Sequence, residues 1–324
     1  MKRFVATLII LSCLCFSVWA KAKDEASVRL LYWNIQNGMW SGQGDNYNTF
    51  VKWVKEKNPD ICVWCEASSN YRTASAEKLD DKERFLPEGW QRLAKRYGHK
   101  HVYKGGHRDN FPQVITSRYP IENVERIVGN NRDSVVSHGA GWARIRLGKK
   151  QFNIVTLHTW PQAYGFSVKK EDRKASRARF EGDRYRRMEI EYILKNTIAT
   201  SENAQNEYWL MMGDFNAISR VDNHIYRENP ASTKFLVHDY IHSYSPYIDL
   251  LWKKNPGDFF RTTGSGKRID FIYVTDAMYK LVSNAGVVYD CYTTPVRDPQ
   301  KLSNFWHPSD HLPIVVDFRV ENLK

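Results

Sequence analysis

The sequence predicts a single α/β domain in which antiparallel or mixed β-sheets pack face to face. Many short apolar runs, typical of strands, alternate with segments of helical spacing. Most of these runs follow one another closely, which favours antiparallel or mixed sheets. No repeat, linker or break in composition divides the 324 residues, and 42% hydrophobic with 26% charged residues is typical of a globular protein.

Each predicted element rests on a local pattern. The run "VRLLYWN" at 28–34 predicts a buried strand, and Phe50, Trp53 and Val54 recur at the spacing of a helix that should end near "NPD" at 58–60. Two further helices are expected, a charged one within 77–97 and a long, strongly basic one over about 170–199. The other strands are expected at 60–66, 111–116, 121–127, 139–147, 151–158, 207–215, 268–275, 285–291 and 312–318.

The N-terminus has the features of a signal peptide. A charged start, "MKR", precedes an apolar stretch that is short for a membrane span, and "VWAKAK" offers cleavage after Ala20 or Ala22. We therefore expect residues 1–22 to be a signal peptide and residues 23–324 to form a single domain. The protein should be exported, periplasmic or secreted, and monomeric.

The five cysteines do not indicate a disulfide framework. Cys13 and Cys15 lie in the leader and raise the alternative of a lipoprotein, although the residues before them fit a lipid-attachment box poorly. Of the remaining three, Cys62 and Cys65 lie in one strand-like run and should point to opposite faces of the strand. We expect them to be packed thiols rather than a redox pair.

The chain is basic, with a formal charge of +12. Removal of the leader and its three cations leaves about +9. A basic exported protein suits anionic partners such as nucleic acid, phospholipid headgroups or phosphorylated small molecules. Since many exported proteins are basic, charge alone does not choose among these partners.

Polar residues stand at the ends or starts of six predicted strands. A single Asp or Asn in such a place is more often a turn or cap residue, because its side chain bonds the local backbone. Six cases together indicate that the strand ends converge on a cleft. The residues are Asn34, Glu66, His158, Asp214 with Asn216, Asp270, and Asp310 with His311.

Such a cleft has a definite chemistry. Clustered carboxylates repel one another unless a cation joins them, and oxygen ligands without cysteine favour Mg²⁺, with Mn²⁺ or Ca²⁺ as alternatives. Imidazole supplies a base near neutral pH, and amides bind phosphate oxygens. These groups predict metal-assisted hydrolysis of a phosphoester. Neither HExxH nor GxSxG occurs, and "GSGKR" at 264–268 lacks the spacing of a P-loop.

Seven motifs carry a resemblance to a known family: "WNIQNG", "PDICVWCE", "ITSRYPI", "IVTLHTWPQ", "MMGDFNA", "KRIDFIYV" and "SDHLPIVV". In this order they resemble the endonuclease/exonuclease/phosphatase superfamily, over about residues 28–318. The resemblance implies a four-layer α/β sandwich of two packed sheets flanked by helices, with the site at one edge. It also implies an enzyme, a metal-dependent phosphoester hydrolase.

The resemblance assigns the metal to one side of the site. Glu66 resembles the principal metal-binding glutamate, Asn34 its nearby partner, and Asp310 an acidic residue often counted as a ligand. Position 36 is Gln, where the abasic-site branch carries an acid. The resemblance therefore does not assign a metal ligand at this position.

The catalytic roles implied by the resemblance fall on five residues. Asp214 and Asn216 resemble the pair that positions the attacking water, the metal or the scissile phosphate. His311 resembles the catalytic histidine and Asp270 the carboxylate that pairs with it. His158 resembles the second histidine of deoxyribonuclease-like members, placed to contact phosphate or protonate the leaving group. Whether His311 or Asp214 is the general base stays open.

The sequence leaves the substrate open among three interpretations. The first is an exported nuclease, the second a phosphatase or phospholipase-C-like enzyme acting on inositol phosphates, phosphoinositides or sphingomyelin, and the third a non-catalytic binding protein. The third is the weakest because every expected catalytic position is filled. The basic stretch 167–188 could bind a nucleic-acid backbone or be a solvated helix face. We expect Trp40, Tyr47 and "NFWHP" at 304–308 to lie near the site.

Overall fold

Two six-stranded β-sheets form the centre of the computed structural model, which describes residues 27–68, 89–106, 111–127, 136–297 and 305–320. The predicted signal peptide lies outside these ranges. In spatial order, the first sheet contains β11 (Val282–Val287), β14 (Ile314–Arg319), β1 (Ser27–Asn34), β2 (Ile61–Cys65), β4 (Val114–Ser117) and β3 (His101–Lys104). The second contains β5 (Ile121–Ile127), β6 (Ala140–Leu147), β7 (Lys150–His158), β8 (Tyr208–Asp214), β10 (Asp270–Val274) and β9 (Ile248–Asp249). β12 (Val296–Arg297) and β13 (Trp306–His307) form a separate pair.

The strand β1 is apolar on both faces because both faces are covered. Leu30 and Tyr32 pack in the core between the two sheets, whereas Leu31 and Trp33 pack against helices on the outside. Such a strand has no solvent face and therefore reads as an unbroken apolar run. β1 pairs in parallel with β2 and antiparallel with β14, and β7 and β8 form the other parallel pair. Both sheets are thus mixed, as predicted.

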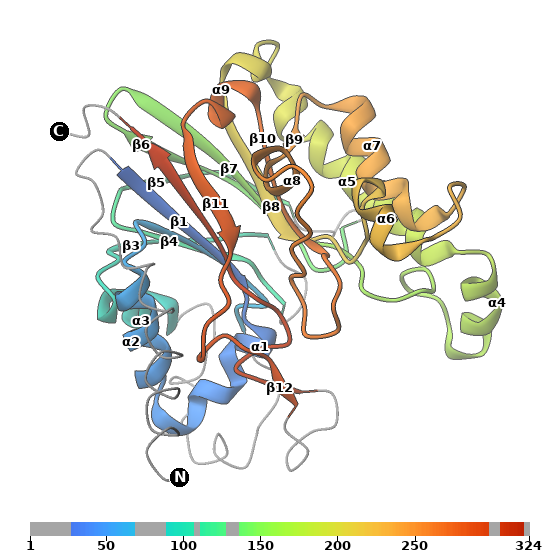
Figure 1. The fold of residues 1–324 in the computed structure, drawn as a ribbon, viewed down its shortest axis with the longest axis horizontal. Coiled ribbons are helices and arrows are strands. Elements are labelled where there is room, and N and C mark those ends of the chain that lie inside the picture. Colours follow the sequence, from blue (N-terminus) through green and yellow to red (C-terminus); the bar gives the residue numbers. More distant parts are fainter. Residues whose placement is uncertain (1–26, 69–88, 107–110, 128–135, 298–304, 321–324) are drawn as a thin grey trace, which may run out of the picture.

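Helices cover the outer face of each sheet and complete the four-layer sandwich that the resemblance implied (Figure 1). α2 (Asn48–Lys57) and α3 (Trp90–Arg96) cover the first sheet. α5 (Glu181–Lys195) and α7 (Leu236–Tyr244) cover the second. The shorter helices are α1 (Gln36–Met39), α4 (Arg173–Ala178), α6 (Asn223–Tyr226), α8 (Leu250–Lys254) and α9 (Asp276–Tyr279), with 3-10 turns at 40–45, 170–172, 198–200, 204–206, 220–222 and 233–235.

The single long helix expected over about 170–199 is wrong. The chain instead forms α4 and then α5, with Phe180 between them in a left-handed conformation (φ 55°) that a continuous helix does not permit. Glu181 and Asp183 stand in the first turn of α5, where their charge favours a new helix start through the helix dipole.

Three other expectations need comment. The strand expected at 285–291 lies at Val282–Val287, and of the helix expected within 77–97 the structure describes α3, while 77–88 lie outside the described residues. Cys62 and Cys65 are free and buried on opposite sides of the first sheet, which confirms packed thiols. Within the described ranges, no helix is both long and apolar enough to cross a bilayer.

Candidate active site

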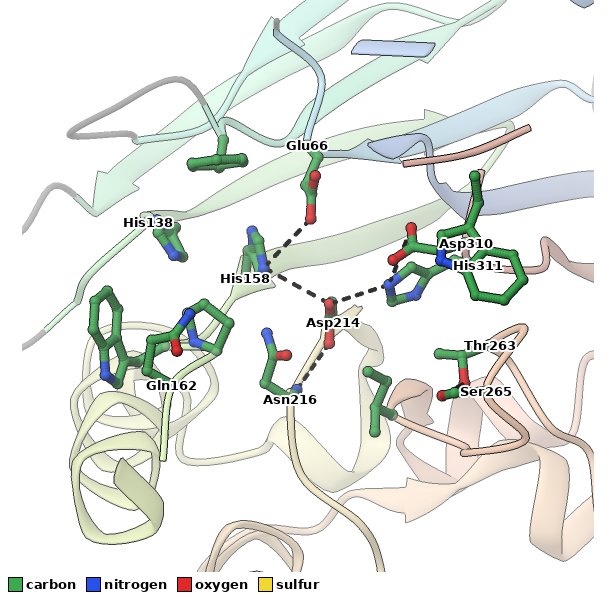
Figure 2. A pocket seen from close by; sticks show the side chains of 15 residues that line it. Glu66, His138, His158, Gln162, Asp214, Asn216, Thr263, Ser265, Asp310 and His311 are labelled. Carbon is green, nitrogen blue, oxygen red and sulfur yellow. Dashed lines mark hydrogen bonds and ion pairs between the residues drawn. The ribbon is translucent and has the colours of Figure 1, made fainter. Parts of the chain in front are cut away.

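The predicted site residues meet at one edge of the sandwich because of strand direction. The parallel strands β7 and β8 end there side by side, with His158 opposite Asp214, and the antiparallel β10 starts there with Asp270 opposite Asp214. In the other sheet β1 ends at Asn34 next to the end of β2, which Glu66 follows. Figure 2 shows side chains from both sheets pointing into one pocket. All eight predicted residues lie in this pocket or directly behind it.

Asn34 holds two carboxylates together on the pocket floor. Its Nδ2 donates to Glu66 Oε1 and to Asp214 Oδ2, both at 3.2 Å, while its Oδ1 accepts from the backbone N–H of Gln36 at 3.1 Å. Glu66 Oε2 also accepts from the backbone N–H of Asn37 at 3.0 Å. Glu66 has a left-handed backbone (φ 54°), a costly conformation of the kind that concentrates at functional sites.

Asp270 orients His311 from behind. Its Oδ2 lies 2.7 Å from His311 Nδ1, and its Oδ1 accepts from the Tyr32 hydroxyl at 2.7 Å. The other imidazole nitrogen, Nε2, therefore faces the pocket, 3.7 Å from Asp214 Oδ2. Burial lowers the pKa of His311, but the Asp270 and Asp310 carboxylates outweigh burial and hold the pKa well above its usual value.

His158 lies opposite His311 across Asp214. Its Nε2 is 3.7 Å from Asp214 Oδ2 and 4.0 Å from Glu66 Oε1 (Figure 2). Burial lowers its pKa well below the usual value, and the nearby His138 and His311 add to the shift. His158 is therefore neutral near pH 7.

Asn216 is fixed beside Asp214 by its own backbone and side chain. Its backbone N–H donates to Asp214 Oδ1 at 2.8 Å, and its Nδ2 donates to the Thr159 carbonyl at 3.0 Å. Asn216 also has a positive φ of 46°. Its amide oxygen and the imidazole of His158 thus border the same side of the pocket.

The carboxylates crowd one another enough to favour a cation. Burial and then the charge of Asp310 raise the pKa of Glu66, and burial and then the charge of Asp270 raise the pKa of Asp214 well above its usual value. Asp310 Oδ1 lies 3.9 Å from His311 Nε2, so these neighbours in sequence reach the same space rather than pointing different ways. Partial burial raises the pKa of Asp310 as well.

The donor atoms suit a hard divalent cation. One ligand atom each from Glu66, His158 and Asp214 lies within 4.8 Å of the others, and so does one each from Asp214, Asp270 and His311. The carboxylate oxygens are donors that Mg²⁺ or Mn²⁺ prefers, whereas the imidazole nitrogens are more typical ligands of transition metals. A cation here would offset the repulsion that raises the pKa values of Glu66 and Asp214.

The pocket also contains an aromatic wall that sequence reasoning missed. The cavity measures about 470 Å³, and Phe111, His138 and Trp160 line it beside His158. The rings of His138 and His158 lie 4.6 Å apart, and His138 lies 5.0 Å from Phe111 and 5.8 Å from Trp160. His138 just precedes β6, which runs antiparallel to β7. Like Asp310, His138 is a polar residue just before a predicted strand, so the same sequence pattern would have indicated it.

Helix α5 holds this wall in place through buried polar groups. Glu189 is fully buried, and its carboxylate accepts from the N–H and hydroxyl of Ser137 at 2.7 and 2.6 Å and from the N–H of Trp160 at 2.8 Å. Burial raises the pKa of Glu189 to about 7, although these hydrogen bonds favour the charged form. One turn earlier, Arg186 donates to the carbonyls of Trp160 and Gln162 at 2.9 and 3.0 Å. Glu189 thereby joins the two loops that carry His138 and Trp160.

Gln36 contacts the opposite rim rather than the carboxylates. Its Oε1 accepts from the backbone N–H of Trp306 at 3.0 Å, and Trp306 lines the pocket, as expected of "NFWHP". Trp40 and Tyr47, which were expected near the site, do not line the pocket. Both are buried, and the Trp40 indole N–H donates to the carbonyl of Trp306 at 2.8 Å. Trp40 also packs edge-on against the ring of Phe305 and so supports the rim.

Comparisons with known proteins agree with this geometry. A model of the Endonuclease/Exonuclease/phosphatase family matches residues 31–311. No curated protein sequence matches the chain.

Several solved structures share the fold. An AP endonuclease from Archaeoglobus fulgidus has a TM-score of 0.57 and 16% identity, covering 90% of this chain and 100% of its own. The 3′ phosphatase NExo from Neisseria, bound to product DNA hairpin, has the same TM-score and identity and covers 90% and 99%. The D. rerio TDP2, complexed with single strand DNA product, has a TM-score of 0.52 and 15% identity and covers 91% and 99%. At such identities the likeness is one of fold.

Proposed function

Because this chain belongs to the endonuclease/exonuclease/phosphatase family, it is a phosphoester hydrolase, and we propose that it is an exported, divalent-metal-dependent phosphodiesterase acting on nucleic acid. The observation that carries the proposal is the buried Asp270–His311 pair, whose Nε2 faces Asp214 beside a cluster of carboxylates. This arrangement can orient water, hold a phosphate and carry a proton.

We assign the metal to Glu66, with Asn34 and Asp310 beside it. Mg²⁺ is the preferred ion, with Mn²⁺ or Ca²⁺ as substitutes, because the donors are carboxylate oxygens. Asn34 turns its Nδ2 toward Glu66 and Asp214 and would therefore position these carboxylates around the ion. When bound, the ion would polarise a phosphate oxygen and offset charge that develops there. Asn34 also keeps Glu66 and Asp214 at a fixed separation through its two Nδ2 hydrogen bonds.

The protein's own residues supply the remaining chemistry. Asp214 and His311, 3.7 Å apart, are the two groups placed to take a proton from the attacking water. Asp270 fixes the His311 tautomer so that Nε2 is the reactive nitrogen. His158 and Asn216 border the pocket on the other side. There, the His158 imidazole and the Nδ2 hydrogen of Asn216 that does not bond Thr159 would donate to the phosphate oxygens that gain charge in the transition state.

Two observations support nucleic acid over a phosphorylated small molecule. Aromatic side chains of Phe111, Trp160 and Trp306 line the pocket, where bases could stack. Two solved structures of similar fold are described with DNA products. The aromatic wall of the pocket therefore offers surfaces on which bases could stack, next to the position proposed for the scissile phosphate.

A substrate panel tests the proposal. Purified protein is incubated with plasmid DNA, with inositol phosphates and with sphingomyelin, in Mg²⁺ and in EDTA, at low and moderate salt. We expect DNA cleavage that EDTA abolishes. Absence of DNA cleavage at every salt concentration, with cleavage of an inositol phosphate or of sphingomyelin, would replace the nuclease by the second interpretation.

A further inference from the structure

A basic segment projects from the sandwich, a few residues after the pocket-lining Trp160 and Gln162 (Figure 1). We define the basic arm as residues 169–179, which include α4. It carries six cationic side chains against two carboxylates, and five of the six cationic residues are exposed. Figure 1 shows α4 standing away from both sheets, beyond the end of α5. Fold stability does not require such an exposed cluster, since most of these side chains are solvated.

The basic arm is nevertheless held in a defined position. The hydroxyl of Ser176, which is buried, accepts from the N–H of Gly165 at 2.9 Å and donates to the carboxylate of Glu181. The guanidinium groups of Arg173 and Arg177 lie over the ring of Tyr164 at 4.5 and 5.3 Å. These contacts keep the cations of the arm in one arrangement, which lowers the entropy cost of binding an extended partner.

The loop that anchors the basic arm is also the wall of the active site. Trp160 and Gln162 line the pocket, and the indole N–H of Trp160 donates to the carbonyl of Tyr164 at 2.6 Å. Trp160 also packs on Phe166 at 5.1 Å, and Phe166 stacks on Tyr185 of α5 at 5.4 Å. An extended substrate that is bound in the pocket and passes Trp160 would therefore run toward the basic arm.

The side chains of the arm favour a polyphosphate backbone over a bilayer. A helix that lies on a membrane presents a large apolar face. α4 reads "RKASRA", with only Ala175 and Ala178 as apolar residues, and Phe180, just after the arm, is the only exposed large hydrophobic residue within the described segment 169–180. Closely spaced Lys and Arg side chains on a polar helix match successive phosphates of a nucleic acid.

We propose that the basic arm binds the backbone phosphates of a nucleic acid strand whose scissile phosphate occupies the pocket. This inference rests on the proposed nuclease function and adds a second contact site, separate from the catalytic groups. Of the basic stretch 167–188, the first half would bind the substrate. Arg186, in the second half, instead donates hydrogen bonds to the carbonyls of Trp160 and Gln162.

The test neutralises three exposed lysines of the arm, Lys169→Gln, Lys170→Gln and Lys174→Gln, and leaves Arg173 and Arg177 on Tyr164. Binding of a labelled DNA duplex is measured against salt concentration, in a His311→Ala background so that bound DNA is not cleaved. We expect affinity to fall on the order of 10- to 100-fold at moderate salt, and the slope of log K against log salt to fall by roughly 1 to 3.

Turnover and a matched control complete the test. With His311 retained, the variant that carries the three lysine substitutions in the basic arm should hydrolyse the small diester bis(p-nitrophenyl) phosphate at the wild-type rate. Lys52→Gln, Lys55→Gln and Lys95→Gln, on α2 and α3 of the other outer layer, should leave DNA affinity and slope unchanged.

Three outcomes would overturn the inference. They are an unchanged salt slope in the arm variant, an equal loss in the control variant, and a loss of binding to phosphatidylglycerol vesicles with DNA binding intact. Failure of the proposed function has a different signature, because the wild type would then not cleave DNA with Mg²⁺ at any salt concentration, whatever the binding data show.

Discussion

Asp270 is the residue through which the fold controls the proposed base. It is fully buried, and each carboxylate oxygen has one partner, the Tyr32 hydroxyl at Oδ1 and His311 Nδ1 at Oδ2. Its backbone N–H donates to the Thr262 hydroxyl at 3.1 Å. With both ends fixed, the carboxylate holds one tautomer of His311, whose Nε2 faces Asp214.

Replacing Asp270 by Asn tests this control. The amide keeps the shape of the side chain but removes the charge and allows the wrong tautomer of His311, so we expect kcat on bis(p-nitrophenyl) phosphate to fall on the order of 10²- to 10⁴-fold. Steady-state kinetics gives the loss, and thermal unfolding should show a folded protein. Tyr32→Phe, which removes only the other hydrogen bond, is the control and should cost much less. Losses of equal size in both variants would contradict the role of Asp270.

At the scale of residues, the sequence indicated which polar side chains lie together. Asn34 and His158 end strands and Glu66 directly follows one, and a polar side chain is conspicuous in such a place after an apolar run. Phe111 and Trp160 were harder to find, because an aromatic residue in a loop is also an ordinary packing residue. Their place in the pocket depends on contacts between loops that no local pattern records.

Helix α5 connects the outer layer to the pocket wall. The Glu189 carboxylate accepts hydrogen bonds from both the loop of Ser137 and the loop of Trp160. Gly182 also helps to join α5 to the loop that carries Trp160 and Gln162. A Cβ at this position would lie 2.1 Å from the Gln162 carbonyl oxygen, so the helix can approach the loop only with glycine here.

Glu189→Gln should weaken this connection. The amide would face at least one N–H or O–H donor with its own NH₂, which leaves a buried donor unsatisfied and costs about 1–3 kcal/mol of unfolding free energy. Urea unfolding measures this loss, and kcat/KM on DNA should fall with it. Glu191→Gln on the same helix removes only partly exposed pairs with Arg187 and Lys195 and should cost less than about 1 kcal/mol. Equal stability of the two variants would show that Glu189 does not join the loops.

The break between α4 and α5 could not be predicted from the sequence pattern. Basic residues dominate 169–187, so composition alone predicts one helix. The left-handed Phe180, the Ser176 hydrogen bonds and the Tyr164 ring under Arg173 and Arg177 decide the outcome. These are tertiary contacts, and they override local helical preference.

The stability of the whole domain in acid should depend on a buried histidine. His238 of α7 is fully buried, with Nδ1 2.7 Å from the Tyr273 hydroxyl and Nε2 3.2 Å from the Ala217 carbonyl. It therefore ties α7 to β10 and to the loop after β8. Burial lowers the pKa of His238 to about 3.

The sign of the pH effect follows from this lowered pKa. Below pH 6.5 the unfolded chain takes up a proton at His238 that the folded protein refuses, so stability falls as pH drops from about 6.5 to 3. The full effect is about 5 kcal/mol. We expect urea unfolding at pH 7 and pH 5 to show a smaller difference in His238→Gln than in the wild type. The exposed His242→Gln on the same helix is the control, and an unchanged pH difference in His238→Gln would contradict the assignment.

The arrangement of the layers could be predicted only in part from local pattern. Apolar runs such as 28–34 and 207–215 indicate strands buried on both faces, which requires covering layers. The order of strands, with β1 beside β14 from the far end of the chain, could not be predicted, because it depends on pairing between segments far apart in the sequence. Short elements such as α6 and β9 have no clear pattern, because they follow from the loops that join larger ones.

The central claim is that the edge where the two sheets meet is a metal-dependent phosphodiesterase centre. The most direct measurement is hydrolysis of bis(p-nitrophenyl) phosphate by chelator-treated protein as Mg²⁺ is added back, for the wild type, Glu66→Ala and His311→Ala, with circular dichroism to verify folding. We predict that Mg²⁺ restores the wild type and that both folded variants stay inactive at every Mg²⁺ concentration. Activity retained in either variant, or a wild type indifferent to Mg²⁺ and chelator, would contradict the account.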